Sequence, residues 1–161
     1  MPELPGTARW LWLSLAVILL DRFSKWQVTA SLDLHERIAL LPGLNLVLAH
    51  NTGAAFSLLR DAGGWQRWFF VLLGLAISAV LAVWMLRLPR SARWMACTLA
   101  LILGGALGNL WDRLQWGYVV DFVDVHVAGW HWPAFNVADS AITIGAAMLI
   151  IGSFRKDSSK S

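Results

Sequence analysis

The sequence predicts an all-α membrane protein with four transmembrane helices, both termini in the cytoplasm and a small extracytoplasmic β-sheet lying on the membrane surface. Three observations support this fold class. Of the 161 residues, 58% are hydrophobic and 14% are charged, whereas soluble domains are about 45–50% apolar. Long apolar segments recur along the chain, and basic residues gather in the segments on one side of them. The length is that of one domain, which we assign to residues 1–161.

The predicted membrane spans have the length of about 20 residues that a bilayer requires. In the first, charged residues follow the apolar run and no small-residue cleavage site appears, which predicts a retained helix rather than a signal peptide. The second contains an uncharged stretch at 68–86, and the third contains Gly104 and Gly108 in the GxxxG spacing of a close-packing helix face. The spans cover residues 10–29, 68–87, 94–113 and 136–154.

The segment between the first two spans, residues 31–64, has a different pattern. Two short apolar runs at 36–41 and 44–50 read as strands, and Pro42-Gly43 between them is a turn signal. The segment has few charges, so we expect a sheet that rests on the bilayer. Residues 114–135 are expected to form a loop.

The charged residues predict the orientation of the spans. One side carries seven basic residues, at positions 9, 87, 90, 93, 155, 156 and 160, against Glu3 and Asp157. The other side carries the remaining six basic residues against eight acids. The positive-inside rule places the first side in the cytoplasm. The tryptophans agree with this orientation, because they cluster at both expected interfaces, as aromatic belts do. We assign positions 10, 12, 84 and 94 to the inner interface and positions 26, 65, 68, 111, 116, 130 and 132 to the outer one.

Four aspartates, at positions 21, 112, 121 and 139, lie beside apolar runs and are brought to the outer face by this topology. A carboxylate near hydrocarbon is costly and usually faces the protein interior. Two carboxylates that share a site can hold one proton between them and act as base and acid. The alternative is that all four pair with Arg22, Lys25 and Arg113. The neighbouring bases favour this structural role for Asp21 and Asp112, whereas Asp121 and Asp139 leave both readings open.

Other chemistries are poorly supported. His126 and His131 with Asp124 do not have the spacing of a common metal motif, and we expect no metal. The single cysteine, Cys97, excludes an internal disulfide and reads as a small core residue. The G-x-S-x-G pattern of a serine hydrolase is absent.

Five stretches together resemble lipoprotein signal peptidase (signal peptidase II, aspartyl peptidase family A8). They are DRFSK at 21–25, NTGAAF at 51–56, GGALGNLWDR at 104–113, VVDF at 119–122 and FNVAD at 135–139. The resemblance covers about residues 9–155, in the family's order. It implies an endopeptidase of the bacterial inner membrane that removes the signal peptide of prolipoproteins, cleaving before a cysteine that carries diacylglycerol.

The resemblance also implies roles for individual residues. Asp121 and Asp139 match the family's catalytic dyad, and Asp21 matches a structural acid. Polar support residues are expected at Asn51, Asn109, Asp112, Arg113 and Asn136. Arg113 is expected either to compensate Asp112 or to meet a lipid phosphate. Asp124 is treated as an extra acid without a catalytic role.

The expected partners are diacylglyceryl-prolipoproteins, membrane lipids and globomycin-type peptide inhibitors, with the active site towards the periplasm. We expect no cofactor, no nucleic acid and a monomer. The small side chains at Gly53, Ala54 and Ala55 predict a wall of the substrate cleft that another backbone can approach closely, with Asn51 near the dyad.

Two other function classes remain open from the residues alone. A small proton-coupled transporter, usually dimeric, also has short spans with intramembrane acids, but it would carry an acid near the midplane and little structure outside the membrane. A non-enzymatic assembly factor has no specific feature in its favour.

Overall fold

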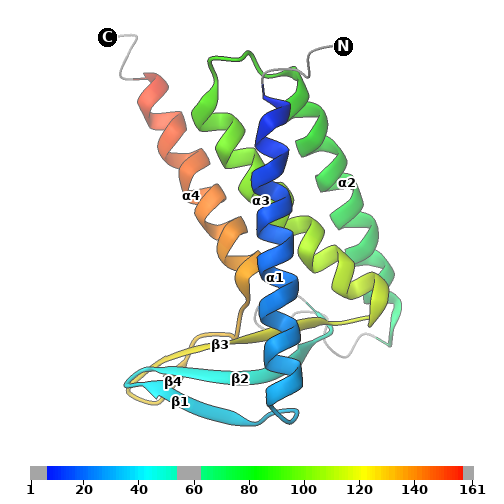
Figure 1. The fold of residues 1–161 in the computed structure, drawn as a ribbon, viewed down its shortest axis with the longest axis vertical. Coiled ribbons are helices and arrows are strands. Elements are labelled where there is room, and N and C mark those ends of the chain that lie inside the picture. Colours follow the sequence, from blue (N-terminus) through cyan, green and yellow to red (C-terminus); the bar gives the residue numbers. More distant parts are fainter. Residues whose placement is uncertain (1–6, 54–62, 158–161) are drawn as a thin grey trace.

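The computed structural model describes residues 7–53 and 63–157, with side chains described up to residue 154. Four long helices form a bundle, and a β-sheet lies at one end of it (Figure 1). A short 3₁₀ helix, Ala8–Trp10, precedes the first helix. The helices are α1 (Leu11–Ser31), α2 (Trp65–Arg87), α3 (Arg93–Gln115) and α4 (Val137–Asp157). The strands are β1 (Arg37–Leu41), β2 (Leu44–Asn51), β3 (Val119–Val127) and β4 (Trp130–His131).

Helix α3 packs against each of the other three helices. Its glycines permit this, because a side chain there would collide with a neighbouring helix. A Cβ atom on Gly104 would lie 2.8 Å from the carbonyl oxygen of Ser14 and from Cβ of Val17, both on α1. A Cβ atom on Gly108 would lie 2.9 Å from the carboxylate of Asp21. The predicted close-packing face is therefore confirmed.

Three helices of the described chain are long and apolar enough to cross a membrane: α2, α3 and residues Val137–Phe154 of α4. Helix α1 differs because Asp21, Arg22 and Lys25 interrupt its apolar character. The structure thus shows three of the four predicted spans by length and composition. Large apolar side chains are exposed along the bundle, among them Trp12, Leu72 and Val80 at more than 60%.

The antiparallel sheet has the strand order β1-β2-β3-β4. Pro42-Gly43 makes the turn between β1 and β2, and Gly43 has the positive φ of 84° that favours glycine. Residues of β2 and β3 that are far apart in sequence are paired, including Ala49 with Asp121 and Asn51 with Val119.

The expectation of a loop over residues 114–135 was wrong. Strand β3 occupies its centre and β4 follows it. Five of the nine residues at 119–127 are Val, and Val alternates with other side chains over 123–127, which is a strand pattern rich in β-branched residues. The segment forms a strand in the structure because it pairs with β2, which lies about 75 residues earlier in the chain.

The sheet is fixed to the bundle by an apolar cluster at the end of α1. Val28 of α1 and Leu32, the residue that follows this helix, pack with Leu48 of β2 and with Val120 and Phe122 of β3. The start of α1 and the end of α4 lie at the opposite end of the bundle (Figure 1). The strand that carries Asp121 is therefore held against the same end of the bundle at which α4 begins.

Candidate active site

Asp139 lies in the first turn of α4 and is held there by a reciprocal cap. The backbone N–H of Asp139 donates to the side-chain oxygen of Asn136 at 2.9 Å, and the backbone N–H of Asn136 donates to Asp139 Oδ2 at 3.2 Å. This is the geometry of a capping box, in which two helix-end donors are satisfied at once. The cap fixes both the start of α4 and the direction of the carboxylate. A third donor, Asn109 Nδ2 on α3, lies 2.7 Å from Asp139 Oδ1.

Asp121 projects from β3 and is also bound by side-chain amides. Asn51 Nδ2, at the end of β2, donates to Asp121 Oδ2 at 3.1 Å. Asn136 Nδ2 donates to Asp121 Oδ1 at 2.8 Å. Asn136 therefore contacts both aspartates, through its backbone and its side chain. Only 3% of Asp121 is exposed, and Asn136 is fully buried.

Burial and the neighbouring charge of Asp139 raise the pKa of Asp121 to about 7, although the amides of Asn51 and Asn136 and the charge of Lys25 act in the opposite direction. A carboxyl group with a pKa near 7 can give or take a proton at neutral pH. The charge of Asp139 therefore acts on the protonation of Asp121.

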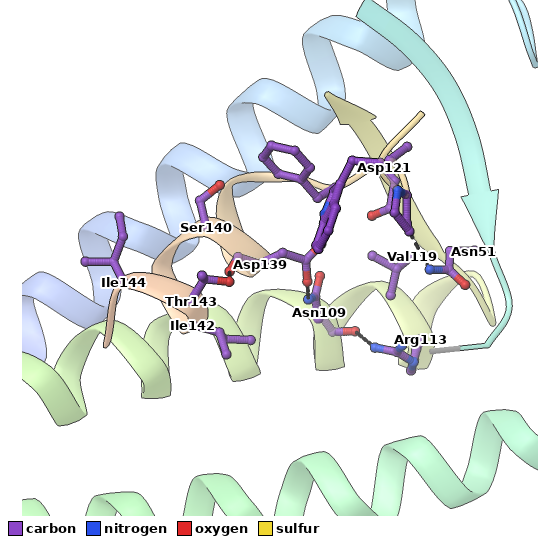
Figure 2. A pocket seen from close by; sticks show the side chains of 14 residues that line it. Asn51, Asn109, Arg113, Val119, Asp121, Asp139, Ser140, Ile142, Thr143 and Ile144 are labelled. Carbon is purple, nitrogen blue, oxygen red and sulfur yellow. Dashed lines mark hydrogen bonds between the residues drawn. The ribbon is translucent and has the colours of Figure 1, made fainter. Parts of the chain in front are cut away.

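A cavity of about 610 Å³ opens beside the two aspartates (Figure 2). Polar groups of β2, α3, β3 and α4 meet at one part of it, while apolar side chains of α4 and of residues 132–135 form the rest. The lining residues are Asn51, Asn109, Arg113, Val119, Asp121, Trp132, Pro133, Ala134, Phe135, Asp139, Ser140, Ile142, Thr143 and Ile144.

Arg113 lies at this cavity, and its described hydrogen bonds go to backbone carbonyls rather than to Asp112. One guanidinium nitrogen donates to the carbonyl of Gly53 at 3.0 Å and another to the carbonyl of Asn109 at 3.3 Å. Gly53 is further tied to the site because its N–H donates to Asn51 Oδ1 at 3.0 Å. Arg113 therefore holds the segment after β2 against α3. Ala54 and Ala55, predicted to form the same wall, lie outside the described residues.

A buried ion cluster lies behind the two aspartates. The ammonium group of Lys25 is 2.7 Å from Asp21 Oδ2 and 2.7 Å from Asp112 Oδ2. Arg22 forms a second ion pair with Asp112. Of the three bases considered as partners for these acids, Arg22 and Lys25 pair with Asp112, and the described ion pairs of Asp112 do not include Arg113. Positions 112 and 113 point to different sides of α3, and Asp112 faces α1.

The chain resembles known proteins over almost its whole length. A family model described as signal peptidase (SPase) II matches residues 13–155. This chain belongs to the signal peptidase II family. A lipoprotein signal peptidase of Pseudomonas fluorescens (strain Pf0-1) is 53% identical over 152 residues, which cover 93% of this chain and 89% of that protein. One of Pseudomonas aeruginosa (strain UCBPP-PA14) is 50% identical over 163 residues, covering 99% and 96%.

A solved structure described as a bacterial membrane enzyme has a similar fold. It superposes with a TM-score of 0.86 at 29% sequence identity and covers 96% of this chain and 92% of that one. Family membership and the apolar helices together identify a multi-pass membrane protease.

Asp124 of this signal peptidase II family member is as buried as Asp121, at 3% exposed, but faces a different part of the sheet. It contacts Asn45, His131 and Arg37 at 2.8, 2.7 and 3.2 Å. Burial opposes its ionisation, yet these partners hold the pKa of Asp124 below its usual value. His126 stacks on His131. In the part of the chain that the structure describes, no group of three or more His, Cys, Asp or Glu could hold a metal.

Two features of the site were not assigned from the sequence. The segment at 132–135 lines the cavity and its Phe135 pairs with Val123 of β3. Lys25 contacts Asn109 as well as the two acids. The spacing of four between Asp21 and Lys25 predicts that both lie on a helix face directed into the bundle, and both are buried, but this spacing does not indicate the contact with Asn109.

Proposed function

We propose that this chain is an intramembrane aspartyl endopeptidase that removes the signal peptide from diacylglyceryl-modified prolipoproteins, cleaving before the lipidated cysteine. The observation that carries the proposal is that Asp121 and Asp139, from different elements, line one cavity and are each held by amide donors. The substrate class is supported by the relatives, which bear the name lipoprotein signal peptidase.

The proposed reaction needs one proton shared by the two carboxyl groups. The ionised carboxylate takes a proton from a water molecule, whose oxygen attacks the carbonyl carbon of the scissile peptide. The protonated carboxyl group stabilises the developing oxyanion by donating to it. A proton then passes to the leaving amine as the C–N bond breaks. The pKa of about 7 for Asp121 supports this division of roles at neutral pH.

The cavity lining supports a lipid-linked substrate. Ile142 and Ile144 of α4 extend the lining beyond the polar groups, and Ile144 is 54% exposed on the outside of the bundle. A substrate with an apolar signal helix and acyl chains can approach along this surface from within the bilayer. Globomycin-type cyclic peptides are proposed to occupy the same cavity.

The proposed membrane arrangement has α1 as the fourth span. Its charges do not exclude this, because Asp21 and Lys25 are 0% and 1% exposed and pair inside the bundle. Buried, paired charges are the form in which ionisable residues occur within membranes. The distribution of basic residues supports a position of the sheet and the cavity on the periplasmic side of the inner membrane.

The test uses purified protein in detergent and a diacylglyceryl-modified precursor, with cleavage followed by a gel shift. Asp121→Asn and Asp139→Asn keep the shape of the side chain but remove its ability to exchange a proton. Each is expected to lower the cleavage rate at least about 1,000-fold, the range lost when a member of a catalytic group is removed.

Asp124→Asn is the matched control, because Asp124 lies on the same strand and is equally buried but does not line the cavity. It is expected to retain most of the activity. Substantial cleavage by either dyad variant would reject that residue as half of the pair. Failure of the unmodified protein to cleave would reject the peptidase assignment.

A further inference from the structure

The ion cluster of α1 and α3 touches the groups that hold both aspartates. Lys25 donates to Asn109 Oδ1 at 3.2 Å, and Asn109 Nδ2 donates to Asp139. Asp21 Oδ1 accepts the N–H of Ala138, the residue before Asp139, at 2.9 Å. Asp112 Oδ2 accepts the N–H of Val120, the residue before Asp121, at 3.3 Å. The cluster therefore accepts a hydrogen bond from the backbone of the residue that precedes each aspartate of the dyad, and it also contacts Asn109, which binds Asp139.

The amide of Asn109 can serve Asp139 in only one of its two orientations. Its oxygen faces Lys25 and also accepts from Asn136 Nδ2 at 3.2 Å, while its nitrogen faces the carboxylate of Asp139 (Figure 2). Turned by 180°, the amide would direct N–H donors at an ammonium group and an oxygen at a carboxylate. Neither contact would then be a hydrogen bond when Asp139 is ionised, because ammonium has no acceptor and a carboxylate no donor.

We propose that Lys25 is a positioning residue for the proposed peptidase reaction: it fixes the amide orientation of Asn109 and thereby directs Asn109 Nδ2 at Asp139. Lys25 does not touch the cavity and is 1% exposed. It acts on the reaction through Asn109 and differs in this from Arg22, the other cation of the cluster.

Arg22 provides the matched control. Both cations pair with Asp112, but the guanidinium group of Arg22 lies over Trp116 at 4.6 Å and is directed to the surface of the bundle, where its side chain is 25% exposed. Of Lys25 and Arg22, only Lys25 makes a hydrogen bond with the Asn109 side chain among the contacts that the structure describes. A general loss of charge pairing would affect variants of Lys25 and of Arg22 alike, whereas a loss of the Asn109 orientation would affect only variants of Lys25.

The experiment compares Lys25→Met, Arg22→Met, Asp21→Asn and the double variant Lys25→Met/Asp21→Asn on the lipid-modified precursor. Lys25→Met alone leaves buried carboxylates without their partner and can fail to fold. The double variant, in which two uncharged side chains replace the pair, is therefore the deciding one.

The kcat of the double variant is expected to fall about 100-fold relative to Asp21→Asn, with KM within about threefold, since misplacing a catalytic group by about 1 Å costs this much. Arg22→Met is expected to stay within about tenfold of the unmodified protein, because Asp112 retains Lys25.

A second readout does not depend on activity. In protein labelled with ¹⁵N-asparagine, the Asn109 side-chain amide resonance is assigned by its loss in Asn109→Asp. We expect this resonance to shift in the double variant and to remain in place in Arg22→Met and Asp21→Asn. An unmoved resonance, or a kcat of the double variant within threefold of Asp21→Asn, would overturn the role of Lys25. If the unmodified protein does not cleave, the proposed function fails and the resonance alone decides this inference.

Discussion

At the residue scale, the fold strongly changes the protonation of Asp121. Burial and Asp139 favour its protonated form, and the amide of Asn51 favours its ionised form. Since the proposed reaction needs one proton on the pair, activity is lost when the pH rises through the pKa of about 7 and the shared proton leaves.

This balance gives a prediction for Asn51→Ala. Removing the donor to Asp121 Oδ2 raises the pKa of Asp121, because the ionised form loses a hydrogen bond. The falling limb of the pH profile of kcat/KM should therefore move to higher pH, whatever happens to the maximal rate. Asn45→Ala is the control, since Asn45 is on the same strand but binds Asp124. A limb that stays in place or moves to lower pH would contradict the prediction.

The residue contacts of the site could be anticipated only in part. Asn136 and Asp139 are three apart at the start of a helix, so the sequence itself indicates their reciprocal cap. The contact between Asn109 and Asp139 joins two helices, and that between Asn51 and Asp121 joins two strands 70 residues apart. Their spacing carries no information about distance. The predicted topology and the small residues after Asn51 placed Asn51 near the dyad, whereas Asn109 was grouped with Asp139 by the family resemblance.

At the scale of the elements, the position of α3 depends on its glycines. We expect Gly104→Ala to destabilise the protein by about 1–3 kcal/mol, the usual cost of overpacking. The new methyl group would meet the backbone of α1 at 2.8 Å, and backbone cannot give way as a flexible side chain can. Thermal unfolding in detergent measures the effect.

Gly74→Ala on α2 is the control for that measurement. Its Cβ atom would make an ordinary contact with Leu110 Cδ1 at 3.5 Å. Equal melting temperatures for the two variants would show that α1 and α3 can move apart without cost.

The strand at Val119–Val127 shows why element prediction was incomplete. Its flanks are a helix end and an aromatic-rich segment, which read as a surface loop. What makes it a strand is the free edge of β2, and β2 is separated from it by two helices in the chain. The helices were predictable because their apolar length is a local property, whereas the pairing of β2 with β3 is not.

At the scale of the whole molecule, the sheet and the loop between α2 and α3 lie at opposite ends of the bundle (Figure 1). Single cysteines introduced in a Cys97→Ala background test the proposed orientation. Ala128→Cys, in the exposed turn after β3, should react with a membrane-impermeant maleimide in spheroplasts. Ser91→Cys, exposed between α2 and α3, should react only after the membrane is broken. The reverse pattern would invert the proposed topology.

The two aspartates belong to different parts of the molecule, one to the sheet and one to the last of the four helices in chain order. During synthesis at a ribosome, Asp121 emerges before α4 exists, and Asp139 reaches its cap only when α4 has entered the bundle. On the proposed mechanism, a partly made chain therefore has no proteolytic activity. Completion of the helix bundle therefore sets the time at which the proposed activity begins.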